Sequence, residues 1–222
     1  MINAAVPGFL PSSHGLRFVN WFPPQRTVFV RVGGRTIFAI GNAADGLCGG
    51  MCCVVRERFE RGLEPWPETE PPDGGSPHFR ELVRRQIDTF ELGLVPLRFY
   101  SLMAFRPDRA TRLSRLLRRR PLAVEMVRRE WPRIRADINA GRLSMIGLVR
   151  IRSIDPRQLG RNHQVICYGY RLDGADLTLA IYDPNHPLDD SVEVRLELSA
   201  DRRSAPVASS TGEPLLAFFQ AG

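Results

Sequence analysis

The sequence lacks the features that mark membrane proteins, secreted proteins and zinc proteins. No apolar run in its 222 residues approaches the roughly 18 residues needed to cross a bilayer. The N-terminal stretch MINAAVPGFLPSSHG has no basic segment followed by a long apolar one, so we expect no secretory signal. The four cysteines are not spaced like zinc ligands, and the adjacent Cys52 and Cys53 do not resemble a disulfide framework. From these absences we expect that the protein binds neither a metal ion nor a cofactor. They favour a cytoplasmic protein, or one exported by a route that needs no signal peptide.

Acidic residues are fewer than basic ones, and the formal net charge of +7 is carried by arginine. The densest basic block is Arg106–Arg135, which is a candidate surface for nucleic acid, anionic lipid or an acidic partner. Apolar Leu113, Leu116 and Leu117 interleave with these arginines at helical spacing, which is typical of a solvated helix face. No known nucleic-acid motif accompanies the charge. We therefore expect no nucleic-acid partner.

The pattern of apolar residues changes along the chain and predicts an α+β fold. Helical periodicity prevails over about residues 42–141, and strand-length apolar or alternating runs prevail over about 142–222. Helices followed by a run of antiparallel strands favour α+β organisation, and the length fits one domain over residues 1–222. No internal repeat is visible.

Turn residues and caps divide these two parts into elements, while the first 26 residues look irregular but packed. We expect a hairpin of Thr27–Val32 and Arg35–Ile40, helices beginning at Cys48, Pro77, Asp108 and Pro132, and strands at Leu143–Ile151, 163–170, 176–183, Ser191–Leu198 and Leu215–Phe219.

The stretch DGLCGGMC, residues 45–52, places a cysteine where a helix begins. Glycine costs a helix about 1 kcal/mol relative to alanine, so Gly49 and Gly50 together indicate close approach by another backbone or by a substrate. A thiol at a helix N-terminus also lies at the positive end of the helix dipole, which lowers its pKa. Cys48 is therefore a candidate nucleophile.

Among the four histidines, His163 stands at the start of a predicted strand, and Asp183 stands at the end of the next. These two strand ends meet in an antiparallel hairpin, but a one-residue slip would reverse the faces. A three-residue loop over 173–175, or a bulge, places His163 and Asp183 on one face; a two-residue Asp-Gly turn does not. Asp183 can then orient the imidazole, and Asn185 could do so instead.

Each of these residues taken alone has an ordinary structural interpretation. A cysteine is usually a small buried hydrophobe, which suits Cys52 and Cys167, and Asp-Pro-Asn at a strand end is a common turn. The combination of Cys48, His163 and Asp183, with an N-terminal helix and a C-terminal sheet, favours a catalytic interpretation.

The segments GNAADGLCGGM, NHQVICYGY and LAIYDPNHP resemble the papain-like cysteine peptidase superfamily. The similarity is greatest to the bacteriocin-processing peptidases, which cleave double-glycine leaders, and to their stand-alone bacterial relatives. In stand-alone members of the superfamily, segments like SSHGLRFVNWF and ADINAGR also recur. The resemblance implies a papain-like fold with the nucleophile at a helix start.

The resemblance also implies a role for each matching residue. Cys48 would be the nucleophile, His163 the general base and acid, and Asp183 the orienting residue. Relatives usually carry a glutamine six residues before the nucleophile to complete the oxyanion hole. This chain has the shorter Asn42 there, so Asn42 must lie closer to the oxyanion.

The expected function is a cysteine hydrolase that cleaves a peptide or isopeptide bond through a thioester on Cys48, with a peptide or protein as substrate. The same residues can transfer the acyl group to an amine instead of water. The alternative is a catalytically weak or inactive papain-like binding module that acts through protein–protein contacts.

Overall fold

The computed structural model of the protein describes residues 1–24, 26–32, 35–42, 46–90, 94–105, 122–198 and 207–221, with the backbone alone for the strands between 26 and 42. The expected helix beginning at Asp108 and much of the Arg106–Arg135 block lie outside these residues.

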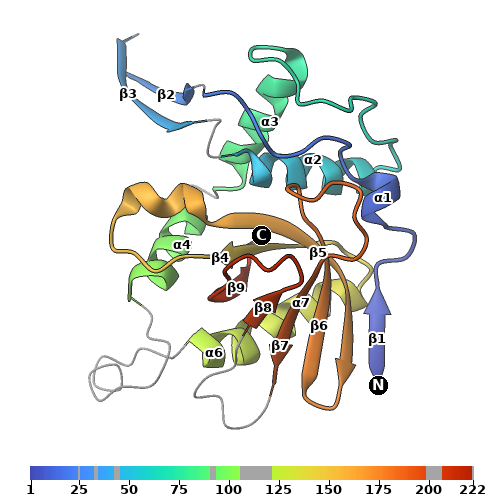
Figure 1. Cartoon of the computed structure of the whole chain (residues 1–222). Coiled ribbons are helices and arrows are strands. Elements are labelled where there is room, and N and C mark those ends of the chain that lie inside the picture. The colour runs from blue at the N-terminus through green and yellow to red at the C-terminus, as the bar shows by residue number, and fades with distance from the viewer. Residues whose placement is uncertain are drawn as a thin grey trace.

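The described residues form nine strands and several helices, shown in Figure 1. The strands are β1 Ile2–Ala5, β2 Arg26–Val32, β3 Arg35–Asn42, β4 Ser144–Val149, β5 His163–Asp173, β6 Asp176–Tyr182, β7 Glu193–Glu197, β8 Val207–Ser209 and β9 Ala217–Gln220. The α-helices are α1 Pro11–His14, α2 Cys48–Glu60, α3 Pro77–Asp88, α4 Leu94–Phe105, α6 Leu122–Glu125 and α7 Trp131–Asn139. A π-helical turn, Met126–Glu130, joins α6 to α7, and a 3₁₀ helix, Pro156–Arg161, precedes β5.

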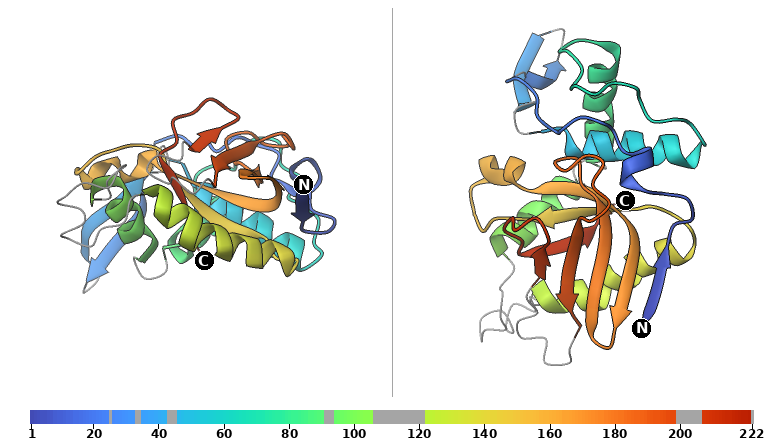
Figure 2. Two further views of the ribbon diagram at one scale, coloured as in Figure 1. Left: turned by 90° about the horizontal axis from the view of Figure 1, so that it is seen from below. Right: turned by 45° about the vertical axis from the view of Figure 1, so that its right-hand side comes forward.

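A curled antiparallel sheet with the order β8-β7-β6-β5-β4-β9 forms the centre of the molecule, and β1 also pairs with β5. The left view of Figure 2 shows α7 against one face of this sheet, and in Figure 1 α2 lies above the first part of β5, with which it is in contact. The predicted hairpin forms as the separate pair β2–β3. The α+β class is confirmed. The N-terminal β1, which the sequence pattern did not reveal, adds a strand to a sheet expected from the second half alone.

The helix predicted at Cys48 is confirmed as α2, and neighbouring elements explain its two early glycines. A Cβ on Gly50 would overlap the carbonyl oxygen of Leu82 in α3. A Cβ on Gly49 would overlap the side-chain amide of Gln164 in β5. The two glycines therefore let a helix and a strand lie directly against the first turn of α2.

A bulge in β5 determines whether Asp183 lies on the same face of the sheet as His163. The three-residue loop at 173–175, the first of the two alternatives, does not form, because Asp173 pairs with Asp176 around a two-residue turn in which Gly174 has a φ of +57°. The register then shifts by one residue between Cys167 and Gly169, so that Cys167 lies opposite Ile181. The bulge, the second of the two expected alternatives, brings His163 and Asp183 to the same face.

Two helical segments differ from expectation. The last helix was expected to start at Pro132, but Pro132 lies inside a continuous helical stretch that begins at Leu122. The π-helical turn just before it changes the backbone pairing, which accommodates a proline that cannot donate a hydrogen bond. The helix α4 was not expected, because apolar residues are spread around all of its sides and the segment therefore shows no helical periodicity.

Most of the remaining elements follow the predicted pattern. Ser76 caps α3 by accepting a hydrogen bond from the Phe79 N–H, and Gly141 ends α7 with a φ of +73°. Cys52 and Cys167 are fully buried in the core, as expected. None of the helices in the part of the chain that the structure describes has both the length and the apolar character that a membrane span requires.

Candidate active site

Cys48 is the first residue of α2 and lies against the beginning of β5. Its Sγ accepts a hydrogen bond from the Gln164 backbone N–H at 3.4 Å. One turn later, Cys52 donates from its Sγ to the Gln164 backbone carbonyl, also at 3.4 Å. The two thiols thus hold the same residue of β5 from the same side of α2. This contact fixes Cys48 beside His163, which precedes Gln164 in the chain.

His163 lies between a thiol and a carboxylate. Its Nε2 is 2.6 Å from Oδ1 of Asp183, and its ring lies close enough to the Cys48 thiol for each of the two groups to shift the pKa of the other. Because Nε2 faces Asp183, Nδ1 is the nitrogen that remains for Cys48. All three side chains are buried, with exposed fractions of 9% for Cys48, 3% for His163 and 2% for Asp183.

The environment of Cys48 favours its thiolate form. Burial by itself raises the pKa of this thiol. The charge and hydrogen bond of His163, together with the N–H groups of Gln164 and Gly49, outweigh burial and lower the pKa below its ordinary value. An anionic sulfur beside an imidazolium is the reactive form of a cysteine nucleophile.

The other three cysteines lie in environments of the opposite kind. Burial raises the pKa of Cys52 and Cys53, and it raises the pKa of Cys167 to about 12. These three thiols stay protonated at neutral pH. Cys48 is the one cysteine of the chain whose surroundings stabilise a negative charge.

His163 and Asp183 each stabilise the charge of the other. Burial lowers the pKa of His163, but the charges of Asp183 and Cys48 and its hydrogen bonds to both raise it to about 9. Burial raises the pKa of Asp183, whereas His163, the Asn185 N–H and Arg150 lower it below its usual range. The Asp183 carboxylate and the His163 imidazolium therefore each favour the charged form of the other.

The structure separates the two candidates for the orienting residue. Asp183 contacts the imidazole directly, whereas Asn185 donates its backbone N–H to Oδ1 of Asp183 at 2.8 Å. The Asn185 side chain accepts a hydrogen bond from Asn20. Asn185 thus supports the carboxylate, and Asp183 holds the histidine. Asn42 is the last residue of β3, and its side chain lies outside the part of the chain that the structure describes.

No protein-family model, curated protein or solved structure matches the chain. The chemistry of the site therefore follows from its own residues.

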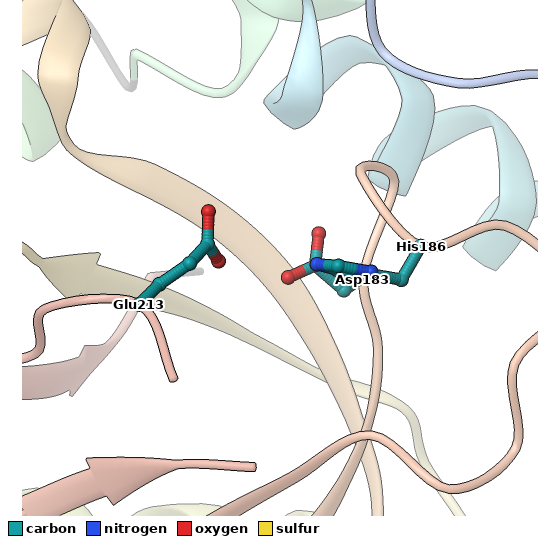
Figure 3. A group of neighbouring side chains, drawn as sticks. All are labelled: Asp183, His186 and Glu213. Atoms are coloured by element: carbon teal, nitrogen blue, oxygen red, sulfur yellow. The ribbon is translucent and has the colours of Figure 1, made fainter. Parts of the chain in front are cut away.

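A second group of polar side chains lies on the other side of Asp183, and it could be taken for a metal site. One ligand atom each from Asp183, His186 and Glu213 lies within 4.8 Å of the others. Figure 3 shows these three side chains. However, Nη2 of Arg150 lies 2.6 Å from Glu213 and 3.7 Å from Asp183. This guanidinium already supplies positive charge to the two carboxylates, so the group does not fit a bound metal ion.

Two residues of the site had no expected role from the sequence. Arg150 directly follows β4, and nothing in the apolar run before it indicates a contact with Asp183. Asn20 lies in the segment SSHGLRFVNWF, in which no sequence pattern indicates a contact with the site. The available signal was a polar residue between Val19 and Trp21 in an otherwise apolar stretch.

Proposed function

We propose that this protein is a papain-like cysteine hydrolase that cleaves a peptide or isopeptide bond through a thioester on Cys48. The observation that carries the proposal is the buried His163 imidazole, whose Nε2 lies 2.6 Å from the Asp183 carboxylate and whose neighbour in the chain, Gln164, donates its N–H to the Cys48 thiol. A nucleophile, its base and an orienting carboxylate joined in this way are what acyl transfer through a thiol requires.

The two half-reactions follow from the charges of the site. The Cys48 thiolate attacks the amide carbonyl carbon, and the new C–S bond places the negative charge on the carbonyl oxygen. As the C–N bond breaks, His163 gives its proton to the leaving nitrogen, and an amine departs. Water then loses a proton to His163 and attacks the thioester, which releases a carboxylic acid and restores the thiolate. An amine in place of water would give acyl transfer.

The oxyanion needs donors beside the sulfur. The N–H of Cys48 lies in the first turn of α2, where backbone N–H groups have no partner within the helix and the helix dipole is positive. Two neighbouring N–H groups already have acceptors: Leu47 donates to Asn20, and Gly50 donates to Gln86. The Cys48 N–H is the donor that we assign to the oxyanion, with Asn42 as the second donor that the resemblance implies.

The environments of the four cysteines argue against a purely structural role for Cys48. A buried structural thiol is expected to have a raised pKa, as Cys52 and Cys167 do. Cys48 is buried to a similar degree but is paired with a histidine that carries its own carboxylate. Such pairing supports catalysis rather than packing.

The first test is the reaction of the protein with p-nitrophenyl acetate. We expect a rapid release of about one nitrophenolate per protein molecule, with an acetyl group mapped to Cys48 by mass spectrometry. The release should disappear in Cys48→Ala. It should persist in Cys53→Ala, a matched variant that removes the half-buried thiol on the same helix.

The second test needs no substrate. At pH 6 a free thiol with a pKa of about 8.5 is less than about 1% ionised, so iodoacetamide should alkylate Cys48 at least about 10-fold faster than the other cysteines. His163→Ala should abolish this advantage. If Cys48 reacts no faster than its neighbours and His163→Ala has no effect, the protein is better described as a papain-like binding module without catalysis.

A further inference from the structure

Asn20, from the segment before β2, joins the two ends of the candidate site. Its Oδ1 accepts a hydrogen bond from the Leu47 N–H at 2.7 Å, immediately before Cys48. Its Nδ2 donates to Oδ1 of Asn185 at 3.0 Å. Its backbone N–H donates to the carbonyl oxygen of Pro184 at 2.9 Å. One residue therefore binds the loop before the nucleophile and the turn that follows Asp183.

The orientation of the Asn20 amide is fixed by these partners. Leu47 offers a backbone N–H, which can only donate, so the atom facing it must be the amide oxygen. The amide nitrogen then faces the side-chain oxygen of Asn185. Both hydrogen bonds are made at once in this orientation, and a flipped amide would lose the bond to Leu47.

The loop before Cys48 is shaped around this side chain. Gly46 has a φ of +88°, which side-chain-bearing residues rarely adopt, and a Cβ at Gly46 would collide with Nδ2 of Asn20. The Leu47 N–H is also one of the donors that a helix start leaves without an internal partner. Asn20 satisfies that donor and occupies the space that Gly46 leaves.

A second path of hydrogen bonds thus connects the thiol end of the site to the carboxylate end. The first path runs through His163, from Cys48 to Asp183. The second runs from Leu47 through the Asn20 side chain to Asn185, whose backbone N–H donates to Oδ1 of Asp183. A closed ring of contacts is harder to distort than a single chain.

We propose that Asn20 is a positioning residue that sets the separation of Cys48 from the His163–Asp183 pair. This inference rests on the proposed function, because it concerns the reactivity of Cys48. Without Asn20, the loop at Gly46 and Leu47 can move relative to the turn after β6, and the thiolate and imidazolium no longer meet in one geometry.

The test compares Cys48 alkylation by iodoacetamide at pH 6 and at pH 10 in the full-length protein. At pH 6 the rate depends on the imidazolium that stabilises the thiolate, whereas at pH 10 any accessible thiol is largely ionised. We expect Asn20→Ala to lower the pH 6 rate about 10-fold and to leave the pH 10 rate nearly unchanged. Release of nitrophenolate from p-nitrophenyl acetate should fall by at least the same factor.

Two further variants sharpen the result. Asn20→Asp keeps the acceptor for Leu47 but loses the bond to Asn185 and adds a negative charge, so it should lower the pH 6 rate more than Asn20→Ala does. Asn20→Ser keeps a short acceptor and serves if Asn20→Ala does not fold; its pH 6 rate should fall between those of the wild type and Asn20→Asp. The matched control is Asn139→Ala, which removes an amide bonded to the Tyr170 hydroxyl at the end of α7 and should change neither rate.

The outcomes separate this inference from the proposed function. If wild-type Cys48 reacts no faster than Cys53 at pH 6, the proposed function fails. If wild-type Cys48 is alkylated faster than Cys53 at pH 6, and Asn20→Ala leaves the ratio of the pH 6 rate to the pH 10 rate unchanged, only the positioning role of Asn20 is wrong. A loss of ester turnover with unchanged alkylation would also overturn it, because Asn20 would then act on the oxyanion. An equal loss in Asn139→Ala would show a general effect on the fold and overturn it too.

Discussion

Replacing Asp183 with asparagine tests the charge balance of the site, because it changes the charge of one side chain and keeps its shape. The amide oxygen of the variant can still accept hydrogen bonds from His163 and from the Asn185 N–H, as Oδ1 of Asp183 does now. The variant loses a negative charge in contact with a buried imidazole. The expected effect is therefore electrostatic rather than steric.

The magnitude follows from the pKa of His163. Burial lowers that pKa, and the charges of Asp183 and Cys48 overcome burial and raise it from 6.5 to about 9. The difference corresponds to about 3 kcal/mol in favour of the imidazolium. Once Asp183 is neutral, burial should prevail, and we expect the pKa of His163 in Asp183→Asn to fall below 6.5. That change is a loss of at least about 300-fold in proton affinity.

Two measurements check this prediction. NMR titration of the His163 ring should give a midpoint near pH 9 in the wild type and below pH 6.5 in Asp183→Asn. Iodoacetamide alkylation of Cys48 at pH 6 should slow in the variant, though less than in His163→Ala, because an imidazole remains. Glu213→Gln is the matched control: it removes a carboxylate that pairs with the same Arg150 but has no contact with His163. A His163 midpoint that is the same in all three proteins would refute the electrostatic argument.

The same substitution has a pH-dependent effect on folding. The raised pKa of His163 means that its pairing with Asp183 stabilises the folded state fully below pH 6.5, and that this contribution is lost as the pH rises through about 9. The lowered pKa of Asp183 means that its contribution is lost in acid, below its ordinary value of 3.8. The wild type should therefore exceed Asp183→Asn in urea stability most between about pH 4 and 6.5, and the two should converge above pH 9.

Three further substitutions test the surroundings of the site. Gly50→Ala should destabilise the protein by about 1–3 kcal/mol in urea unfolding, because its Cβ would overlap the Leu82 carbonyl. At an ordinary position inside a helix, replacing glycine with alanine stabilises the protein. An increase in stability would therefore contradict the close contact between Gly50 and Leu82. Glu130→Ala should cost about 3 kcal/mol, because this fully buried carboxylate pairs with Arg98; a loss below about 1 kcal/mol would show that the pair does not matter. Arg150→Gln should raise the pKa of Asp183, since it removes a nearby cation, and should shift acid unfolding to higher pH; an unchanged acid transition would contradict this role.

The α+β class and most elements could be predicted because their signals are local. The helix at Cys48, the Ser76 cap of α3 and the alternating strand β7 each depend on spacing within one segment. The segments that escaped prediction lack such signals. The helix α4 has apolar residues spread around all of its sides, and β1 is a short strand that pairs with the edge that β5 offers it.

The sequence by itself determined which residues were candidates for the site. A cysteine at a helix start, a histidine opening one strand and a carboxylate closing the next are local features, and their order along the chain indicated how they could meet. The burial of Cys52 and Cys167 on core faces was equally readable, because it follows from the period of each element.

Only the tertiary structure decided whether these candidates face one another. The sequence left two registers open for the β5–β6 hairpin, and the bulge between Cys167 and Gly169 decides between them. A bulge depends on how the whole sheet curls, so no local pattern reveals it. The contacts of Asn20 with Leu47 and Asn185 were hidden for a related reason. They join residues up to 165 positions apart, and such pairings exist only once the chain has folded.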